Sequence, residues 1–110
     1  MQPPVVEVLN EAGRAPYVLV CEHAANHLPP AYGSLGLGAA DLSRHIGWDI
    51  GAAAVARALS ALIDAPLVLA GYSRLLIDLN RPPGSATSIP AISEATVIPG
   101  NQDLSAPEVQ

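Results

Sequence analysis

The sequence is 110 residues long, half of them hydrophobic, and carries a formal net charge of −5 at pH 7. A chain of this size and hydrophobicity can bury one modest core and is too apolar to be wholly disordered. Its five basic residues are all arginines and form no cluster, which argues against nucleic acid or an anionic membrane as a partner. Neither a signal peptide nor a transmembrane segment is expected, and the single Cys21 fits a reducing cytoplasm.

The first part of the chain predicts an edge strand and then a buried strand. Residues 5–9 suit the edge strand, and residues 18–21 are a short apolar run, rich in β-branched side chains, that follows Pro16. Four polar side chains come within six residues after that run: Glu22, His23, Asn26 and His27. Ligands bind outside the carboxyl ends of strands in open α/β sheets, so this point is the first candidate site.

The middle of the chain predicts a strand–helix–strand unit. Prolines and glycines make residues 28–38 a surface loop, with one short turn at 41–45. Residues 48–63 have the composition of a helix, and Val55, Leu59 and Leu62 recur at the spacing of one buried stripe, with Arg57, Ser60 and Asp64 on the solvent side. Residues 67–70 are a second apolar run, which should lie parallel to the first.

The last part of the chain is less regular. Residues 75–79 form a third apolar run, which we interpret as another short strand. Residues 82–110 are rich in proline, glycine and serine and show no periodic segment. So long an irregular stretch is unusual in a compact domain unless it covers an active site or belongs to something larger.

Five blocks, in the same order and with matching gaps, resemble one known family. They read CEHAANHLP, LGL, HIGWDIGAAAVARAL, YSRLLIDLNRP and SIPAISEATVIPGNQDLS. From Tyr17 to the last residue the chain resembles the N-formylglutamate amidohydrolases. The resemblance implies an α/β fold of three layers with a mainly parallel sheet, like the zinc exopeptidases. Residues 1–110 would be the amino-terminal part of one such domain, and residues 82–110 a loop segment over the active site.

The resemblance also implies an activity. It predicts metal-dependent hydrolysis of the amide bond of N-formyl-L-glutamate, or of a related N-acyl acidic amino acid, to give formate and glutamate. Zinc is the expected metal, because a bound metal generates a nucleophilic water at neutral pH. The family's later histidine-containing segments are absent from this sequence, so we expect the 110-residue chain alone to be inactive.

The candidate metal residues follow the first predicted strand. His23 is the best ligand candidate, and Asn26 stands where zinc exopeptidases often have a second, acidic ligand. Glu22 is the catalytic candidate, although it could equally be a ligand or orient His23. His45 and Asp49, four residues apart, are possible supporting residues, but capping and dipole compensation also explain Asp49. His27 is expected to be structural, and hydrogen bonding to backbone groups would also explain His23.

The block YSRLLIDLNR contains the candidates for substrate binding. An acidic substrate carries carboxylates, and a guanidinium group binds a carboxylate at two points. Arg74 and Arg81 are therefore substrate candidates, and Asn80 beside Arg81 is similar to the Asn-Arg pair with which zinc carboxypeptidases hold a terminal carboxylate. Alternatively, both arginines form internal ion pairs with carboxylates of the chain, the candidates being Asp78, Asp49 and Glu22.

Two other functions remain open at this point. The chain could be a non-catalytic α/β module that binds a small acidic metabolite, or a truncated fragment that folds poorly or acts only with a missing half. Nucleotide binding is disfavoured because no glycine-rich loop follows either early strand. Polar residues in the last part, Ser88, Glu94 and Asn101, are interpreted as loop-forming.

Overall fold

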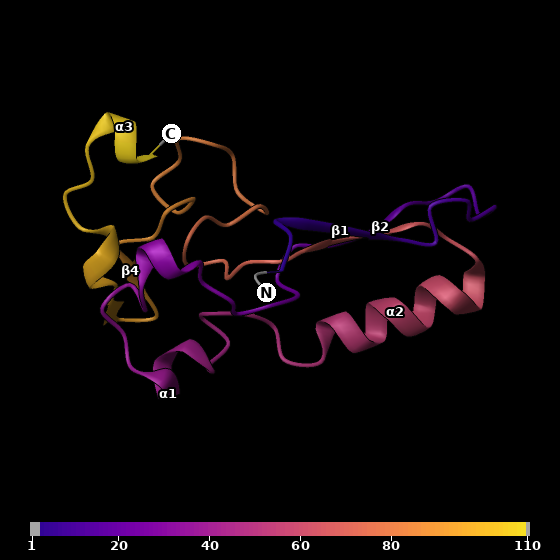
Figure 1. Ribbon diagram of the computed structural model, residues 1–110, viewed down its shortest axis with the longest axis horizontal. Helices are drawn as coiled ribbons and strands as arrows, with labels where there is room; N and C mark the ends of the chain where they lie inside the picture. The colour runs from indigo at the N-terminus through magenta and orange to yellow at the C-terminus, as the bar shows by residue number, and fades with distance from the viewer. Residues whose placement is uncertain (1–2, 110) are drawn as a thin grey trace.

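A small mixed sheet organises one end of the molecule (Figure 1). The computed structural model describes residues 3–109. The sheet has the order β1-β3-β2, formed by β1 (Val6–Leu9), β2 (Leu19–Cys21) and β3 (Leu67–Ala70). β2 pairs with β3 in parallel, as the predicted strand–helix–strand unit requires, whereas β1 is antiparallel to β3. The fold is therefore α/β, and its sheet is mixed.

Helix α2 (Ala52–Ile63) covers one face of this sheet. The alternation of side chains along a strand sends Leu67 and Leu69 of β3, with Cys21 of β2, to that face. Alanines of α2 pack against them. Because alanine side chains are small, the helix can approach the strands closely. On the opposite face, Val8, Val68 and Val20 stand in register across the three strands.

The predicted buried stripe of this helix is wrong for the described chain. Val55 is 68% exposed and Leu62 is 83% exposed, whereas Ser60, expected in solvent, is only 3% exposed. The Ser60 hydroxyl donates a 2.6 Å hydrogen bond to the Ala65 carbonyl, which satisfies it inside the fold. The helix also begins four residues later than predicted, after Gly51, whose φ of 85° is left-handed.

A second hydrophobic cluster joins the loops at the other end of the molecule. Its buried side chains are Leu35, Leu37, Ile46, Leu75 and Ile98. The elements around it are short: η1 (Pro30–Tyr32), α1 (Ala39–Leu42), β4 (Ile92–Ser93), β5 (Thr96–Val97), η2 (Pro99–Asn101) and α3 (Ala106–Val109). The long irregular stretch is thus folded around a few apolar side chains rather than around regular structure.

The predicted strand at residues 75–79 does not form. The chain turns there, because the Ser73 hydroxyl accepts a hydrogen bond from the Leu75 N–H and the Ser73 carbonyl accepts one from Leu76 N–H. Leu75 is buried in the second cluster as part of this turn. The segment therefore carries its polar side chains on a loop between the two clusters.

None of the helices described between residues 3 and 109 has the length and apolar character needed to cross a membrane.

Candidate active site

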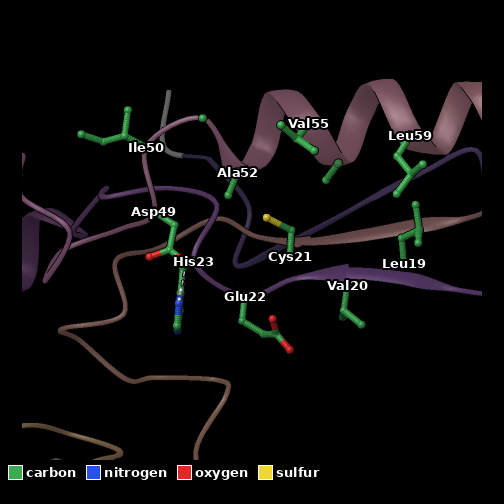
Figure 2. Close-up of a pocket in the computed structure, with 12 residues that line it drawn as sticks. Leu19, Val20, Cys21, Glu22, His23, Asp49, Ile50, Ala52, Val55 and Leu59 are labelled. Atoms are coloured by element: carbon green, nitrogen blue, oxygen red, sulfur yellow. Dashed lines mark hydrogen bonds and ion pairs between the residues drawn. The ribbon is translucent and has the colours of Figure 1, made fainter.

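An imidazole between two carboxylates lies at the carboxyl end of β2. His23 Nδ1 is 3.2 Å from Asp49 Oδ2, and His23 Nε2 is 2.7 Å from Asp78 Oδ1. The Asp49 N–H also donates to the His23 carbonyl at 2.9 Å, so the segment before α2 is tied to the end of the strand. Figure 2 shows the side chains of His23 and Asp49 meeting beside the start of the helix. Three segments far apart in the sequence thus converge on one ring.

Asp78 is the most buried member of this network. Its side chain is 3% exposed, against 51% for Asp49. Besides His23, it accepts hydrogen bonds from the Arg74 guanidinium at 3.0 Å and from the Asn80 N–H at 2.9 Å. A buried carboxylate is tolerated only when it is paired and hydrogen-bonded in this way.

These contacts set the protonation state of Asp78. Burial by itself would raise the pKa of this carboxyl group, because it penalises the charged form. The hydrogen bonds from His23 and from the Asn80 N–H outweigh burial, with help from the charges of His23 and Arg74, and the pKa lies below its usual value. Asp78 is therefore an anion under ordinary conditions.

Arg74 links the two carboxylates. Its guanidinium is 3.0 Å from Asp78 Oδ2 and 3.7 Å from Asp49 Oδ1. Its backbone N–H donates to the Gly47 carbonyl at 3.3 Å, which holds its loop against the segment before α2. The internal ion pairs weighed for this arginine from the sequence are present.

Arg74 and Arg81 also line a common pocket of about 250 Å³. The opposite wall comes from the irregular segment, at residues 87, 90 and 92–94. The Asp78 N–H donates to the Ser88 carbonyl at 2.7 Å, so the two walls are directly connected. Arg81 is exposed and donates to the Asn80 carbonyl at 3.1 Å. Asp78 and Glu94 line the same pocket, and Arg74 is paired with Asp78, so the exposed Arg81 guanidinium is the group that suits a carboxylate of a ligand.

The other candidates from the sequence lie outside the His23 network. The Glu22 side chain points away from His23 and Asp49 (Figure 2). The Asn26 amide donates to the Leu42 carbonyl at 3.1 Å and so holds α1. His45 is exposed and lies 3.4 Å from Glu94. His27 packs its ring against Tyr72, with a centroid separation of 5.6 Å.

The His23 network contains some of the donor groups that a metal site needs. Asp49 and Asp78 contact different nitrogens of the His23 ring, and residues 3–109 contain no group of three or more His, Cys, Asp or Glu side chains placed to hold a metal. The donor chemistry nevertheless fits a half-site. A zinc-binding histidine usually donates its other N–H to a carboxylate, which is what Asp78 accepts from Nε2. In that tautomer Nδ1, which lies 3.2 Å from Asp49 Oδ2, would carry the lone pair for a metal.

Comparison with known protein families identifies the family of this chain. Residues 15–110 match the model of a family described as N-formylglutamate amidohydrolase, over the amino-terminal portion of its domain. The chain belongs to the N-formylglutamate amidohydrolase family. Comparison with curated proteins gave no match.

A solved relative of this family member shares its fold. The protein in the crystal structure of gene product Atu2144 from Agrobacterium tumefaciens is 50% identical in sequence to the chain described here, and the two structures match with a TM-score of 0.93. The match covers 96% of this chain and 42% of that one. The family member described here therefore spans less than half the length of that relative.

Sequence reasoning missed the central position of Asp78. It treated this residue only as an ion-pair partner for the arginines. The available signal was its place inside the apolar run LLIDL, because an aspartate among buried aliphatic residues must be paired. What the sequence could not show is that His23, 55 positions away, is one of the partners.

Proposed function

We propose that this chain contributes the amino-terminal half of the active site of a metal-dependent amidohydrolase. Its substrate is N-formyl-L-glutamate or a related N-acyl acidic amino acid, and the products are the acid, formate in the first case, and the free amino acid. The observation that carries the proposal is the family match over residues 15–110 together with the buried carboxylate–histidine pair at the end of β2. The chain alone is inactive in this proposal, because it supplies only a half-site.

Each residue of the network has a distinct role in this proposal. Asp78 accepts a hydrogen bond from the Nε2–H of His23 and so fixes both the tautomer and the orientation of the ring. His23 then presents Nδ1 to a zinc ion, and Asn26 and Glu22 remain candidates only if their side chains turn toward it. A bound zinc ion would supply a Lewis acid that lowers the pKa of a bound water to about 7. His45 and Asp49 would act on the surroundings of the ring rather than on substrate.

The substrate carboxylates would bind in the pocket between Arg74 and Arg81. Arg81 is the better candidate, because its guanidinium is exposed and the Arg74 guanidinium is already paired with Asp78 and Asp49. Asn80, beside Arg81, can add an amide donor. The walls from residues 87–94 would exclude water from this part of the substrate.

Zinc titration of the 110-residue chain tests the metal assignment. We expect one zinc ion to bind in calorimetry, and we expect His23→Ala to weaken binding by about 100-fold, since removing one ligand from an incomplete site leaves little affinity. His45→Ala is the matched control, because this exposed histidine lies on a loop and contacts Glu94 instead. Equal zinc binding by the His23→Ala and unsubstituted chains would refute the assignment.

A non-catalytic binding module is the second candidate function. The exposed Arg81 guanidinium in the 250 Å³ pocket favours it, since a guanidinium suits the carboxylate of an acidic metabolite whether or not a metal is present. Binding of N-formyl-L-glutamate that is unchanged by a chelator and by His23→Ala, but lost in Arg81→Ala, would favour the module over the enzyme.

A further inference from the structure

Glu94 belongs to the wall of the Arg81 pocket that the irregular segment supplies. The charged side chains that line this pocket are Arg74, Asp78, Arg81 and Glu94. Arg74 and Asp78 pair with each other at 3.0 Å, so their charges largely cancel. The lining therefore presents one guanidinium, that of Arg81, and one carboxylate, that of Glu94, to anything that enters.

Arg81 and Glu94 have only weak partners within residues 3–109. The Arg81 guanidinium donates to a neutral group, the backbone carbonyl of Asn80. Glu94 Oε1 lies 3.4 Å from His45 Nε2, and these two side chains are 62% and 64% exposed. Ion pairs between exposed side chains contribute little, because solvent screens them. A ligand can therefore contact both charged groups without breaking a strong internal interaction.

The turn that Glu94 forms does not explain why a glutamate stands there. Glu94 and Ala95 are the central residues of the β4–β5 hairpin, and their φ values of 49° and 64° are both left-handed. Such turns favour Asn-Gly, because most side chains disfavour this backbone conformation. The hairpin is fixed in place by Arg44, whose guanidinium donates to the Thr96 hydroxyl at 3.0 Å. Backbone strain beside a pocket points to a role in that pocket.

A carboxylate across a pocket from a guanidinium selects a ligand that carries both charges. A plain dicarboxylate would be attracted by Arg81 and repelled by Glu94. A free α-amino acid instead offers a carboxylate to the guanidinium and an ammonium group to the carboxylate. Hydrogen bonds between charged groups are stronger than those between neutral groups, so both ends of such a zwitterion are recognised.

We propose that Glu94 is a specificity-determining residue that binds the ammonium group of a free amino acid whose carboxylate is held by Arg81. The inference rests on the proposed function, because it concerns the same pocket, and it makes the amino acid product the preferred ligand. Hydrolysis of N-formyl-L-glutamate breaks the amide C–N bond, and water gives its oxygen to formate and its two protons to the nitrogen. Glu94 thus faces a neutral N–H before the reaction and an ammonium group after it. The product is therefore held more tightly than the substrate.

Calorimetry with the 110-residue chain in a chelator-containing buffer tests this preference. The probes are L-glutamate, N-formyl-L-glutamate and glutarate, which has two carboxylates and no nitrogen. We expect L-glutamate to bind most tightly, and Glu94→Gln to weaken its binding by at least about tenfold, because the amide keeps the shape and removes the charge. Glutarate should bind Glu94→Gln at least as tightly as the unsubstituted chain. Glu11→Gln is the matched control, since it removes the same charge from an exposed turn outside the pocket.

The three probes separate the possible outcomes. A loss of affinity in Glu94→Gln that is confined to the ligands with nitrogen, and largest for L-glutamate, supports the proposal. Equal losses for L-glutamate and glutarate, an unchanged affinity for L-glutamate, or no binding of L-glutamate to the unsubstituted chain overturns it. Both variants are at exposed positions, and urea denaturation should show that they are as stable as the unsubstituted chain. The chelator makes these results independent of zinc, so failure of the metal assignment would appear only in the His23→Ala titration.

Discussion

Asp78 connects more parts of the candidate site than any other single residue does. Its buried carboxylate holds the His23 ring, the Arg74 guanidinium and the Asn80 N–H in fixed positions. These partners come from the turn after β2 and from the loop after β3, so one side chain connects the candidate metal ligand to the candidate substrate pocket. Asp49 contacts the same ring from the other side but is half exposed. Its contribution to the network should therefore be much smaller.

Replacement of each carboxylate separates these contributions. Asp78→Ala should lower the free energy of unfolding by about 3 kcal/mol, because it leaves a buried arginine contact and an imidazole N–H without their acceptor. Asp49→Ala should cost less than about 1 kcal/mol, since solvent screens an exposed ion pair. Urea denaturation of both variants measures the difference. Equal losses would contradict the ranking of the two carboxylates.

The lowered pKa of Asp78 also predicts an acid-sensitive fold. A carboxyl group whose pKa is lower in the folded than in the unfolded state stabilises the fold fully above its unfolded value, near 3.8. That stabilisation is lost as the pH falls through the lower folded value. Between pH 5 and pH 2 the unsubstituted chain should therefore lose more stability than Asp78→Asn, as measured by denaturation at each pH. Parallel losses would show that other carboxylates dominate.

The two faces of helix α2 are the reverse of those that its hydrophobic pattern predicts. Small alanines and the buried Ser60 face the sheet, and the larger aliphatic residues face outward. The hydrophobic periodicity predicted that the larger residues are in the core, because it reflects the hydrophobicity of a side chain and not whether its size fits against the sheet. Within this chain, alanine allows close packing on β2 and β3, while the aliphatic stripe is exposed.

Two truncations on this helix distinguish the faces. Leu62→Ala should change the free energy of unfolding by less than about 0.5 kcal/mol, because Leu62 is 83% exposed. Ser60→Ala should cost about 1 kcal/mol, since it removes the buried hydrogen bond to the Ala65 carbonyl. Thermal or urea melts of the two variants give the order. A larger loss for Leu62→Ala would mean that the stripe is buried in the free chain.

Local sequence patterns predicted strands of the three-stranded sheet but missed the short strands in the irregular last part of the chain. The predictions for residues 18–21 and 67–70 are confirmed, as β2 and β3, because β-branched runs next to prolines have few alternatives. The β4–β5 hairpin was missed because its turn residues, Glu94 and Ala95, have φ of 49° and 64° without the usual Asn-Gly signal. The site depends on contacts between distant segments, so only its residue types could be predicted.

At the scale of the whole molecule, two clusters meet at the His23 network. The sheet and α2 form one cluster, and the loops around Ile46, Leu75 and Ile98 form the other. Residues 47–49 and 73–78 run between them and carry the ion pairs. The molecule extends 45 × 29 × 28 Å, with the site at the junction. An apolar groove between β2 and α2 opens at the same junction and is lined at one end by His23 and Asp49.

We propose that this chain provides a metal half-site for hydrolysis of an N-acyl acidic amino acid. Formate release from N-formyl-L-glutamate, in the presence of zinc, by a chimera in which this chain replaces the matched region of the Agrobacterium chain tests that proposal. We predict release that a chelator abolishes and that falls by at least about 1,000-fold in His23→Ala, with His45→Ala unaffected. A folded chimera that releases no formate, or equal release by its His23→Ala variant, would refute the proposal.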